Sequence, residues 1–535
     1  MRKIKSLLNP HQGLLFLALL YLGFPLFAGG GGQKETAAAP DTVVEFPLKE
    51  KAALTYWTPL ALQASRVMDD YNGSLVYKEM EKVTNVHINF IHPAQGQVSE
   101  QFNLMIASGE YPDLIAGARD YPGGIDKAIE DGVYLQLNDL IEKYAPNYEA
   151  IRKQNPEAGR ETVGDSGKLG AIYPLLRQEN LCWYGLTMRK DWLDETGLPV
   201  PETIDDWDKI LRAVKKNHPN SIPLIFGTNA PVVIFKDSGL DGNGLFLSAW
   251  NLGPGFYREG NTIKYGPIQD NLKNYLALLN GWYKDGLIDK DFPARDERGI
   301  QSVVSSGQVW AGVQSIDIMN NLFSSQSIEW VTAPYPVLKK GDKIRYRAKD
   351  WVISPGEVAV STQCKNPALA VKWLDYAYSE KGSLLYNFGV EGETYTLVNS
   401  QPQFTDLVMR NPSVPTEIAL YLYKMQAGPH LRWGAYANPG TLINKKVMDG
   451  KIAWTDSVGY DLMVPPVTLT ADEGKEAARI LSVTNVYRNE MFIRFIMGET
   501  PLDKFGDYVA EMKKMGIDTA VAQYQAAYDR FMKRR

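Results

Sequence analysis

Cysteine and histidine are scarce in this chain of 535 residues. It contains two cysteines, Cys182 and Cys364, and five histidines. Two cysteines so far apart do not make a disulfide framework: one bridge could form in an oxidising compartment, or both could be buried thiols. His87 and His92 lie close together but lack a third ligand at a recognisable spacing. We therefore expect no zinc or other metal site from them.

The short motifs of several enzyme classes are absent as well. The chain has no glycine-rich phosphate loop and no dinucleotide-binding fingerprint. It also lacks the G-x-S-x-G nucleophile elbow, which disfavours a Ser-His-Asp hydrolase. We expect no cofactor.

Positive charge is in slight deficit, and part of it lies at the N-terminus. Arg2, Lys3 and Lys5 precede an apolar run at residues 13–27, and Ala28 offers a small residue for cleavage, as in a secretory signal peptide. Removing residues 1–28 takes away these three positive charges and no acidic residue, so the formal net charge falls from −5 to −8. We expect no binding to nucleic acid or anionic membrane. A local arginine cluster could still accept an anionic ligand.

Residues 29–49 are predicted to form a flexible leader, because their first part is polar and of low complexity. Neither cysteine lies near this segment. The sequence thus predicts an exported protein, periplasmic or extracellular, that is not lipid-anchored through an N-terminal cysteine. An uncleaved membrane anchor is the alternative.

Aromatic residues are plentiful, at 11% of the chain with 12 Trp and 29 Tyr. Most of them must lie in the core. Carbohydrate recognition most often explains the surplus, because the C–H faces of sugar rings pack on flat aromatic faces. A mature chain of about 500 residues exceeds what one core usually serves, so we expect two domains.

Strands and helices alternate in the first part of the chain. The pattern predicts strands at residues 53–57, 86–91 and 114–115, with helices at residues 74–84 and 99–107 between them. This β-α-β-α-β order is the right-handed parallel unit of an α/β protein. Later elements are expected as strands at residues 171–175, 183–188 and 358–361 and as helices at residues 124–131, 137–144, 188–196, 203–216, 271–284, 366–378, 471–497 and 502–535.

The third predicted strand leads into a loop that carries Arg119 and Tyr121. Open α/β sheets bind ligands at the carboxyl ends of their strands. These two residues are therefore candidates for ligand contact, with a solvated arginine and a packed tyrosine as the alternative.

Several segments, in the expected order, resemble the family 1 extracellular solute-binding proteins of ABC transporters for oligosaccharides. They are residues 100–109, 191–193, 282–289, 387–390 and 525–530. The similarity is to the long subgroup that includes lipoproteins and alginate-oligosaccharide-binding proteins. It implies a periplasmic-binding-protein-like type II fold: two α/β lobes joined by a multi-crossing hinge, with a helical C-terminal region.

The resemblance also implies lobe boundaries and partners. The first lobe should take residues 50–175 plus 315–395, and the second residues 176–314 plus 396–535. The implied function is capture of an oligosaccharide for delivery to a membrane permease, by a protein that we expect to be monomeric. The calcium loop of the alginate-binding relatives has no counterpart at residues 217–223, where the series of oxygen ligands is missing, and residues 241–244 look like a plain turn.

Twelve residues are candidate ligand contacts. Trp282 matches, through the resemblance, a tryptophan that stacks on sugar, although its helix must also face a core. Trp57 ends the first strand, and Trp433 lies with an arginine in a loop, where a core role is harder to assign. Ser315 and Asp317 head a predicted helix whose free N–H groups could hold a hydroxyl. The full set is Trp57, Arg119, Tyr121, Glu179, Trp183, Trp282, Ser315, Asp317, Trp351, Tyr395, Arg432 and Trp433.

Two other functions stay open. A glycoside hydrolase needs two carboxylates roughly 5 Å or 6.5–9.5 Å apart, and the nearest candidates are Glu179, Glu391 and Glu393. No motif assigns them. A sugar-sensing receptor subunit would keep the same fold and ligand without an importer.

Overall fold

The structure is a computed structural model. It describes residues 44–225, 246–295, 297–322, 328–346, 353, 355–425, 428–439, 441 and 444–534. The predictions for the signal peptide, for the leader up to residue 43, for the turn at residues 241–244 and for Trp351 lie outside these residues. Within them, no helix combines the length and the apolar character needed to cross a membrane.

The first sheet has four strands in the order β11-β3-β1-β2. Its strands are β1 (Ala52–Trp57), β2 (Val86–Ile91), β3 (Leu114–Ala116) and β11 (Val358–Val360). Strand β1 pairs in parallel with β2 and with β3, whereas β11 runs antiparallel to β3. The predicted β-α-β-α-β start is confirmed.

Local signals fix the helices of this unit. Helix α1 (Leu75–Thr84) begins where the Ser74 hydroxyl accepts a hydrogen bond from the Tyr77 amide, 3.3 Å away. Helix α2 (Val98–Ser108) ends at Gly109, whose φ of 72° is the left-handed conformation that glycine tolerates. Further helices that pack with this sheet are α3 (Gly124–Glu130), α4 (Asn138–Tyr144), α5 (Pro146–Gln154), α6 (Pro156–Thr162), α12 (Pro367–Tyr376) and α13 (Glu380–Phe388).

The second sheet also has four strands, in the order β10-β5-β9-β6. They are β5 (Gly185–Arg189), β6 (Ile222–Ile225), β9 (Val309–Gln314) and β10 (Trp330–Ala333). Helix α7 (Lys190–Thr196) follows β5 directly, so the predicted helix starts two residues later than expected. Helix α8 (Ile204–Asn217) begins with a capping box of Thr203 and Asp206.

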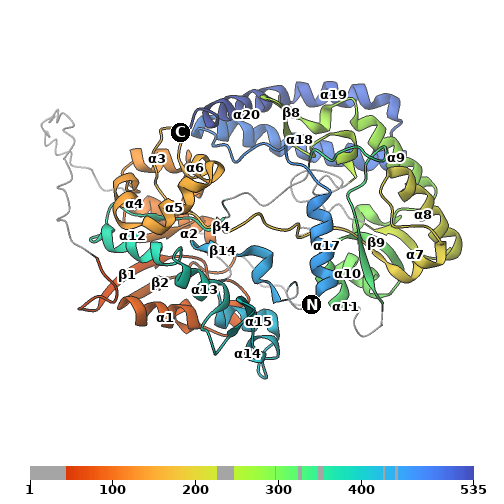
Figure 1. Ribbon diagram of the computed structural model, residues 1–535. Coiled ribbons are helices and arrows are strands. Elements are labelled where there is room, and N and C mark those ends of the chain that lie inside the picture. Colours follow the sequence, from red (N-terminus) through yellow and green to blue (C-terminus); the bar gives the residue numbers. More distant parts are fainter. Residues whose placement is uncertain are drawn as a thin grey trace, which may run out of the picture. The chain divides into compact units, whose positions relative to one another are not determined.

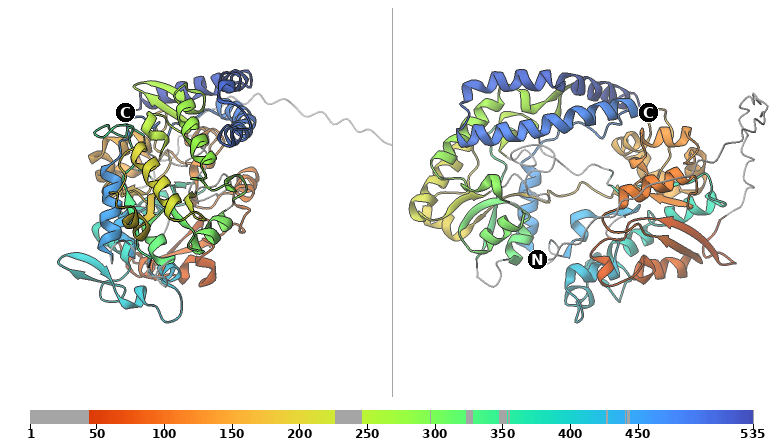
Figure 2. Two further views of the ribbon diagram at one scale, coloured as in Figure 1. Left: turned by 90° about the vertical axis from the view of Figure 1, so that its right-hand side faces the viewer. Right: turned by 180° about the vertical axis from the view of Figure 1, so that it is seen from behind.

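Helices dominate the rest of the second core. They are α9 (Leu272–Lys284), α10 (Glu297–Ser305), α11 (Ile316–Leu322), α17 (Lys445–Asp456), α18 (Ala471–Met497), α19 (Phe505–Lys514) and α20 (Ile517–Phe531). The predicted helix at residues 502–535 is broken, because Gly516 takes a φ of 101° between α19 and α20. Helices α18 and α20 lie side by side (Figures 1 and 2).

Three two-stranded sheets complete the strands. They are formed by β4 (Leu175–Leu176) with β14 (Leu431–Arg432), by β7 (Phe256–Glu259) with β8 (Thr262–Tyr265), and by β12 (Tyr395–Val398) with β13 (Gln401–Phe404). The strand expected at residues 171–175 is shorter than predicted. Since β4 and β5 belong to different sheets, residues 177–184 carry the chain from one core to the other.

The two hydrophobic cores divide the chain differently from the resemblance. Residues 316–322 and 328–346 pack in the second core, because β10 pairs with β5, whereas the first lobe was expected to include them. Core residues up to Leu431, beyond helices α14 (Asp406–Met409) and α15 (Thr416–Tyr423), pack in the first core, although its expected limit was residue 395. That the two cores move as lobes stays a prediction. Cys364 lies in the first core and Cys182 in the second, and both are buried free thiols.

Candidate functional site

Residues 177–184, which connect the two cores, carry two groups of aromatic and charged side chains. The first group forms at the ends of β4 and β14, which run in parallel. The Arg177 amide donates to the Arg432 carbonyl at 2.9 Å, and this contact sets the two strand ends beside each other. The guanidinium carbon of Arg177 lies 4.3 Å from the ring centroid of Trp433. Carboxyl ends of parallel strands are where α/β sheets bind ligands.

Helix α13 holds Trp433 in place. The indole N–H donates to the Ser383 hydroxyl at 2.9 Å, and the Trp433 amide donates to the Asn387 side-chain carbonyl at 3.0 Å. Phe388 meets the indole edge-on at 5.1 Å between centroids. The ring is half-buried and fixed on its core side.

Asn180 ties the connecting segment to the loop after Trp433. Its side-chain carbonyl accepts hydrogen bonds from the amides of Leu181 at 3.1 Å and Ala435 at 2.8 Å. Gly434 allows this approach, since a Cβ there would lie 2.3 Å from the same oxygen. Glu179 is exposed, and its charge adds to burial in raising the pKa of Tyr436.

Buried basic groups lie behind Trp433. The Lys424 ammonium donates to the Ala437 carbonyl at 2.9 Å. Burial and then the charge of Arg432 lower the pKa of Lys424 to about 7. The same two causes, in that order, lower the pKa of His430 to about 3. Burial thus disfavours the charged forms of Lys424 and His430 at this end of β14.

The second group surrounds Lys451, whose side chain is fully buried on α17. Its ammonium lies 4.7 Å from the ring centroid of Trp183, 3.5 Å from Asp317 Oδ1 and 3.2 Å from the Thr441 hydroxyl. Burial lowers the pKa of Lys451, and Asp317 opposes that shift. Ser315 donates its hydroxyl to Asp317.

Ser315 and Asp317 therefore act here through their side chains. The Ser315 amide already donates to Gln314 Oε1 at 2.8 Å. Three of the predicted contacts, Trp183, Ser315 and Asp317, thus meet around a lysine.

Three predicted aromatic contacts are buried. Trp57 is 5% exposed and meets Phe102 edge-on at 5.6 Å. Tyr395 is 3% exposed and packs against Phe388. As placed, neither offers an open face to a solute.

Trp282 is the most enclosed of the three, at 1% exposed. Its indole N–H donates to Asp208 Oδ1 at 2.9 Å, and its ring meets Phe246 edge-on at 5.6 Å. This is the core role that its helix also allowed.

Arg119 and Tyr121 line a separate cavity of about 710 Å³, as do Arg530 and Arg534. Arg119 lies 3.2 Å from Glu357 Oε2, and its guanidinium carbon is 5.7 Å from the ring centroid of Tyr173. The Tyr121 hydroxyl donates to Asp131 Oδ2 at 2.7 Å. Burial, followed by Asp131, raises the pKa of Tyr121 to about 12.

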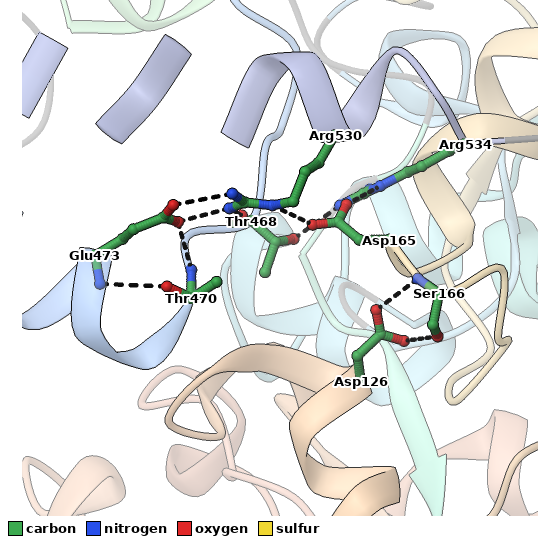
Figure 3. Close-up of polar contacts among 8 residues, drawn as sticks. All are labelled: Asp126, Asp165, Ser166, Thr468, Thr470, Glu473, Arg530 and Arg534. Carbon is green, nitrogen blue, oxygen red and sulfur yellow. Dashed lines mark hydrogen bonds and ion pairs between the residues drawn. The ribbon is translucent and has the colours of Figure 1, made fainter. Parts of the chain in front are cut away.

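Three of the residues that line this cavity, Asp165, Arg530 and Arg534, are joined by ion pairs (Figure 3). Arg530 Nε donates to Asp165 Oδ2 at 2.9 Å, and Arg534 Nε donates to Asp165 Oδ1 at 2.7 Å. Arg530 also donates from both terminal nitrogens to Glu473, at 2.9 and 2.5 Å. Glu473 in turn accepts the Thr470 amide at 2.9 Å in the capping box of α18. We name Asp165, Glu473, Arg530 and Arg534 the paired network.

No group of three or more His, Cys, Asp or Glu side chains is arranged to hold a metal ion among the residues the structure describes. At the expected position of the calcium loop, α8 is followed by His218, whose Nε2 lies 2.6 Å from Glu195.

Sequence reasoning did not single out Arg177, Asn180 or Lys451. Arg177 directly follows a predicted strand, so the rule that selected Arg119 could have found it. Lys451 gave no signal, because nothing in the sequence of α17 distinguishes this buried lysine from the other lysines of the same helix. Two of its partners, Trp183 and Asp317, are more than a hundred positions away in sequence.

Comparison with known proteins gives consistent results. The family model described as bacterial extracellular solute-binding protein matches residues 70–383, more than half of the chain. The fructooligosaccharide ABC transporter substrate-binding protein FusA of Streptococcus pneumoniae serotype 4 is 26% identical, over 94% of this chain and 95% of its own. Lipoprotein LipO of Bacillus subtilis is 26% identical over 63% of this chain and 66% of its own. The solved structure of the alginate-binding protein AlgQ2 is 23% identical, with a TM-score of 0.66 over 90% of this chain and 99% of its own.

Proposed function

The chain belongs to the bacterial extracellular solute-binding protein family, and we propose that it is the substrate-binding protein of an ABC importer, with an oligosaccharide as its solute. The near full-length similarity to a fructooligosaccharide-binding protein supports this choice of solute class. The protein acts outside the cytoplasm, as the description of its family states. We propose that it acts as a monomer, without catalysis, and delivers the solute to membrane permease subunits.

One observation carries the proposal for the site: two indoles lie beside the connecting segment, and a cation lies against each of them. Trp433 with Arg177 lies at the end of β14, whose Leu431 packs in the first core, and Trp433 itself packs against a small cluster with Phe388. Trp183 lies against Lys451 of α17, a helix whose Val447 and Trp454 pack in the second core. An indole face accepts the apolar face of a sugar ring, and the neighbouring polar groups accept its hydroxyls. We propose Trp183, Trp433, Arg177, Asp317 and Glu179 as the ligand contacts.

A binding protein of this kind needs no reaction. A ligand that contacts both cores favours the arrangement in which both sets of contacts exist, and this differential affinity is what shifts a conformational equilibrium. A permease can then distinguish the loaded from the empty protein.

The test is calorimetric titration of the mature protein with a panel of neutral and uronic-acid oligosaccharides. We expect at least one to bind, and Trp433→Ala and Trp183→Ala each to weaken it by at least about tenfold, the loss expected for a stacking contact of about 1.4 kcal/mol. The sugar should be recovered intact. Recovery of shortened sugar would identify a hydrolase, and a panel without any ligand would contradict the proposed solute class.

Trp282→Ala is the matched control, because it removes the same side chain from the core. Emptying a buried site of this size costs about 3–5 kcal/mol of folding free energy. We expect a lowered urea midpoint with unchanged affinity. If Trp282→Ala instead weakened binding as much as Trp433→Ala, the proposed contacts would be in the wrong place.

Two finer points have direct tests. Light scattering of the purified protein measures its oligomeric state. Mass spectrometry of the exported protein shows whether a lipid is attached.

A further inference from the structure

The charge around Trp433 suggests which kind of oligosaccharide the site takes, and this step rests on the proposed function. The protein as a whole is acidic, with a formal net charge of −5. At the ends of β4 and β14, however, two arginines, Arg177 and Arg432, lie beside each other, and Glu179 is nearby in sequence. A local field of sign opposite to the net charge attracts ligands that the net charge would repel.

Arg177 is the cation that can reach a solute. Its side chain is exposed, and among the residues that the structure describes it forms no ion pair. Its guanidinium lies over Trp433, a position that occupies one face of the group. The N–H donors of a guanidinium point outward in its own plane, and they match the two oxygens of a carboxylate.

Lys424 is a second basic group near Trp433, although burial lowers its pKa to about 7. Lys424 is buried against the Ala437 carbonyl, next to the loop that carries Trp433. Its charge is disfavoured there by burial and by Arg432. An anion bound near Trp433 would relieve that repulsion, so the buried lysine supports an acidic ligand without touching it.

Several other basic residues of the described chain contrast with Arg177. Arg119 faces Glu357, Lys451 faces Asp317, and Arg530 and Arg534 face carboxylates in the paired network. These cations meet carboxylates, whereas Arg177 lies against an indole and forms no ion pair with any residue that the structure describes.

We propose that the solute is an acidic oligosaccharide and that Arg177, stacked on Trp433, binds the carboxylate of a uronic-acid residue. Trp433 then contacts the sugar ring next to that carboxylate. Arg177 is the residue that determines specificity for charge, and Trp433 contributes affinity for any sugar that stacks.

The experiment compares oligouronides with their own methyl esters, which keep the sugar skeleton and remove only the charge. Short oligomers of galacturonate, mannuronate and glucuronate are titrated in both forms. We expect the wild-type protein to bind at least one acid at least about tenfold more tightly than its ester. The difference should shrink between about 0.01 M and about 1 M salt, because the screening length falls from about 30 Å to about 3 Å.

Variants assign the preference to one residue. Arg177→Gln should reduce the acid-to-ester affinity ratio to near one, and Arg177→Lys should restore part of it, since the charge returns without the paired donors. Arg66→Gln removes an exposed arginine elsewhere and should keep the wild-type ratio.

The outcomes separate the two proposals. Binding of neutral oligosaccharides or esters, with the acids equal or weaker, overturns the acidic ligand and leaves the binding protein in place. A preference for acids that survives Arg177→Gln overturns the role of Arg177. A panel in which no saccharide binds overturns the proposed function and this inference with it.

Discussion

In two regions of this molecule, the basic side chains have different kinds of partner. In the paired network, Arg530 and Arg534 each meet a carboxylate, and Asp165 serves both (Figure 3). Around Trp433, Arg177 meets an indole and Lys424 meets a carbonyl. The first region joins the C-terminal end of the chain to the loop after α6 and to the start of α18. The second lies beside the segment that connects the two cores.

The difference indicates what each region is for. A guanidinium whose donors are already occupied by carboxylates holds the fold together and has little left to offer a ligand. A guanidinium that lies over a half-buried ring and meets no carboxylate keeps its N–H donors for a ligand. Arginine content alone therefore does not identify the site; the partners of each arginine do. Three predictions test this contrast.

The largest effect is expected from Lys424→Met as the pH changes. Lys424 has a pKa of about 7 in the folded protein, whereas a lysine in the unfolded chain has one of about 10.4. Between these values the unfolded chain holds a proton that the folded protein does not, so stability rises with pH through this window. From pH 7 to pH 10 the wild type should gain about 2–4 kcal/mol relative to the variant.

Urea unfolding of both proteins across that pH range measures the gain. Lys153→Met, at an exposed lysine, is the control and should run parallel to the wild type. If the free energy of unfolding changed with pH in the same way for Lys424→Met and the wild type, the pKa of Lys424 would not be lowered in the folded protein. The contrast between the paired network and the region around Trp433 would then not extend to Lys424.

Asp165→Ala should have the next largest effect, because it removes the carboxylate that two arginines share. The Arg534 side chain is 2% exposed and Asp165 is 23% exposed. Removing one partner of a buried pair leaves an uncompensated charge; allowing for the partial exposure of Asp165, we expect a loss of about 2–3 kcal/mol.

Asp406→Ala is the matched control, since Asp406 and Arg410 form an ion pair at the surface. We expect no measurable change from it. A similar small effect from both variants would mean that the paired network contributes nothing to the fold.

Much of the fold could be predicted from local signals, as particular elements show. Helix ends depend on contacts between residues that are at most four positions apart. Examples are the left-handed Gly109 at the end of α2 and the capping boxes that begin at Thr203 and Thr470. The alternation around β1, β2 and β3 likewise reflects short-range patterning. The placement of β10 could not be predicted, because antiparallel pairing with β5 joins residues about 140 positions apart.

The site was harder to predict for the same physical reason. Aromatic residues at a loop or strand end were candidates, and Trp183 and Trp433 do lie beside the connecting segment. Trp282 looked equivalent in sequence, yet it lies in the core. Whether a tryptophan faces solvent depends on how its helix is rotated against neighbours such as α8, and those neighbours are distant in sequence.

The smallest effect on stability is expected from Arg177→Gln, the variant that should matter most for ligand charge. An exposed cation over an aromatic ring contributes about 0.5–1 kcal/mol, and no described carboxylate loses a partner when Arg177 is replaced. The urea midpoint should therefore stay close to that of the wild type, while the affinity ratio between acid and ester changes strongly. A large loss of stability would show that Arg177 holds the end of β4 in place, and the open guanidinium would then belong with the paired network. If Arg177→Gln is as stable as the wild type and its acid-to-ester affinity ratio is changed, Arg177 differs measurably from the arginines of the paired network. Only Arg177 could then be replaced without a loss of folding stability.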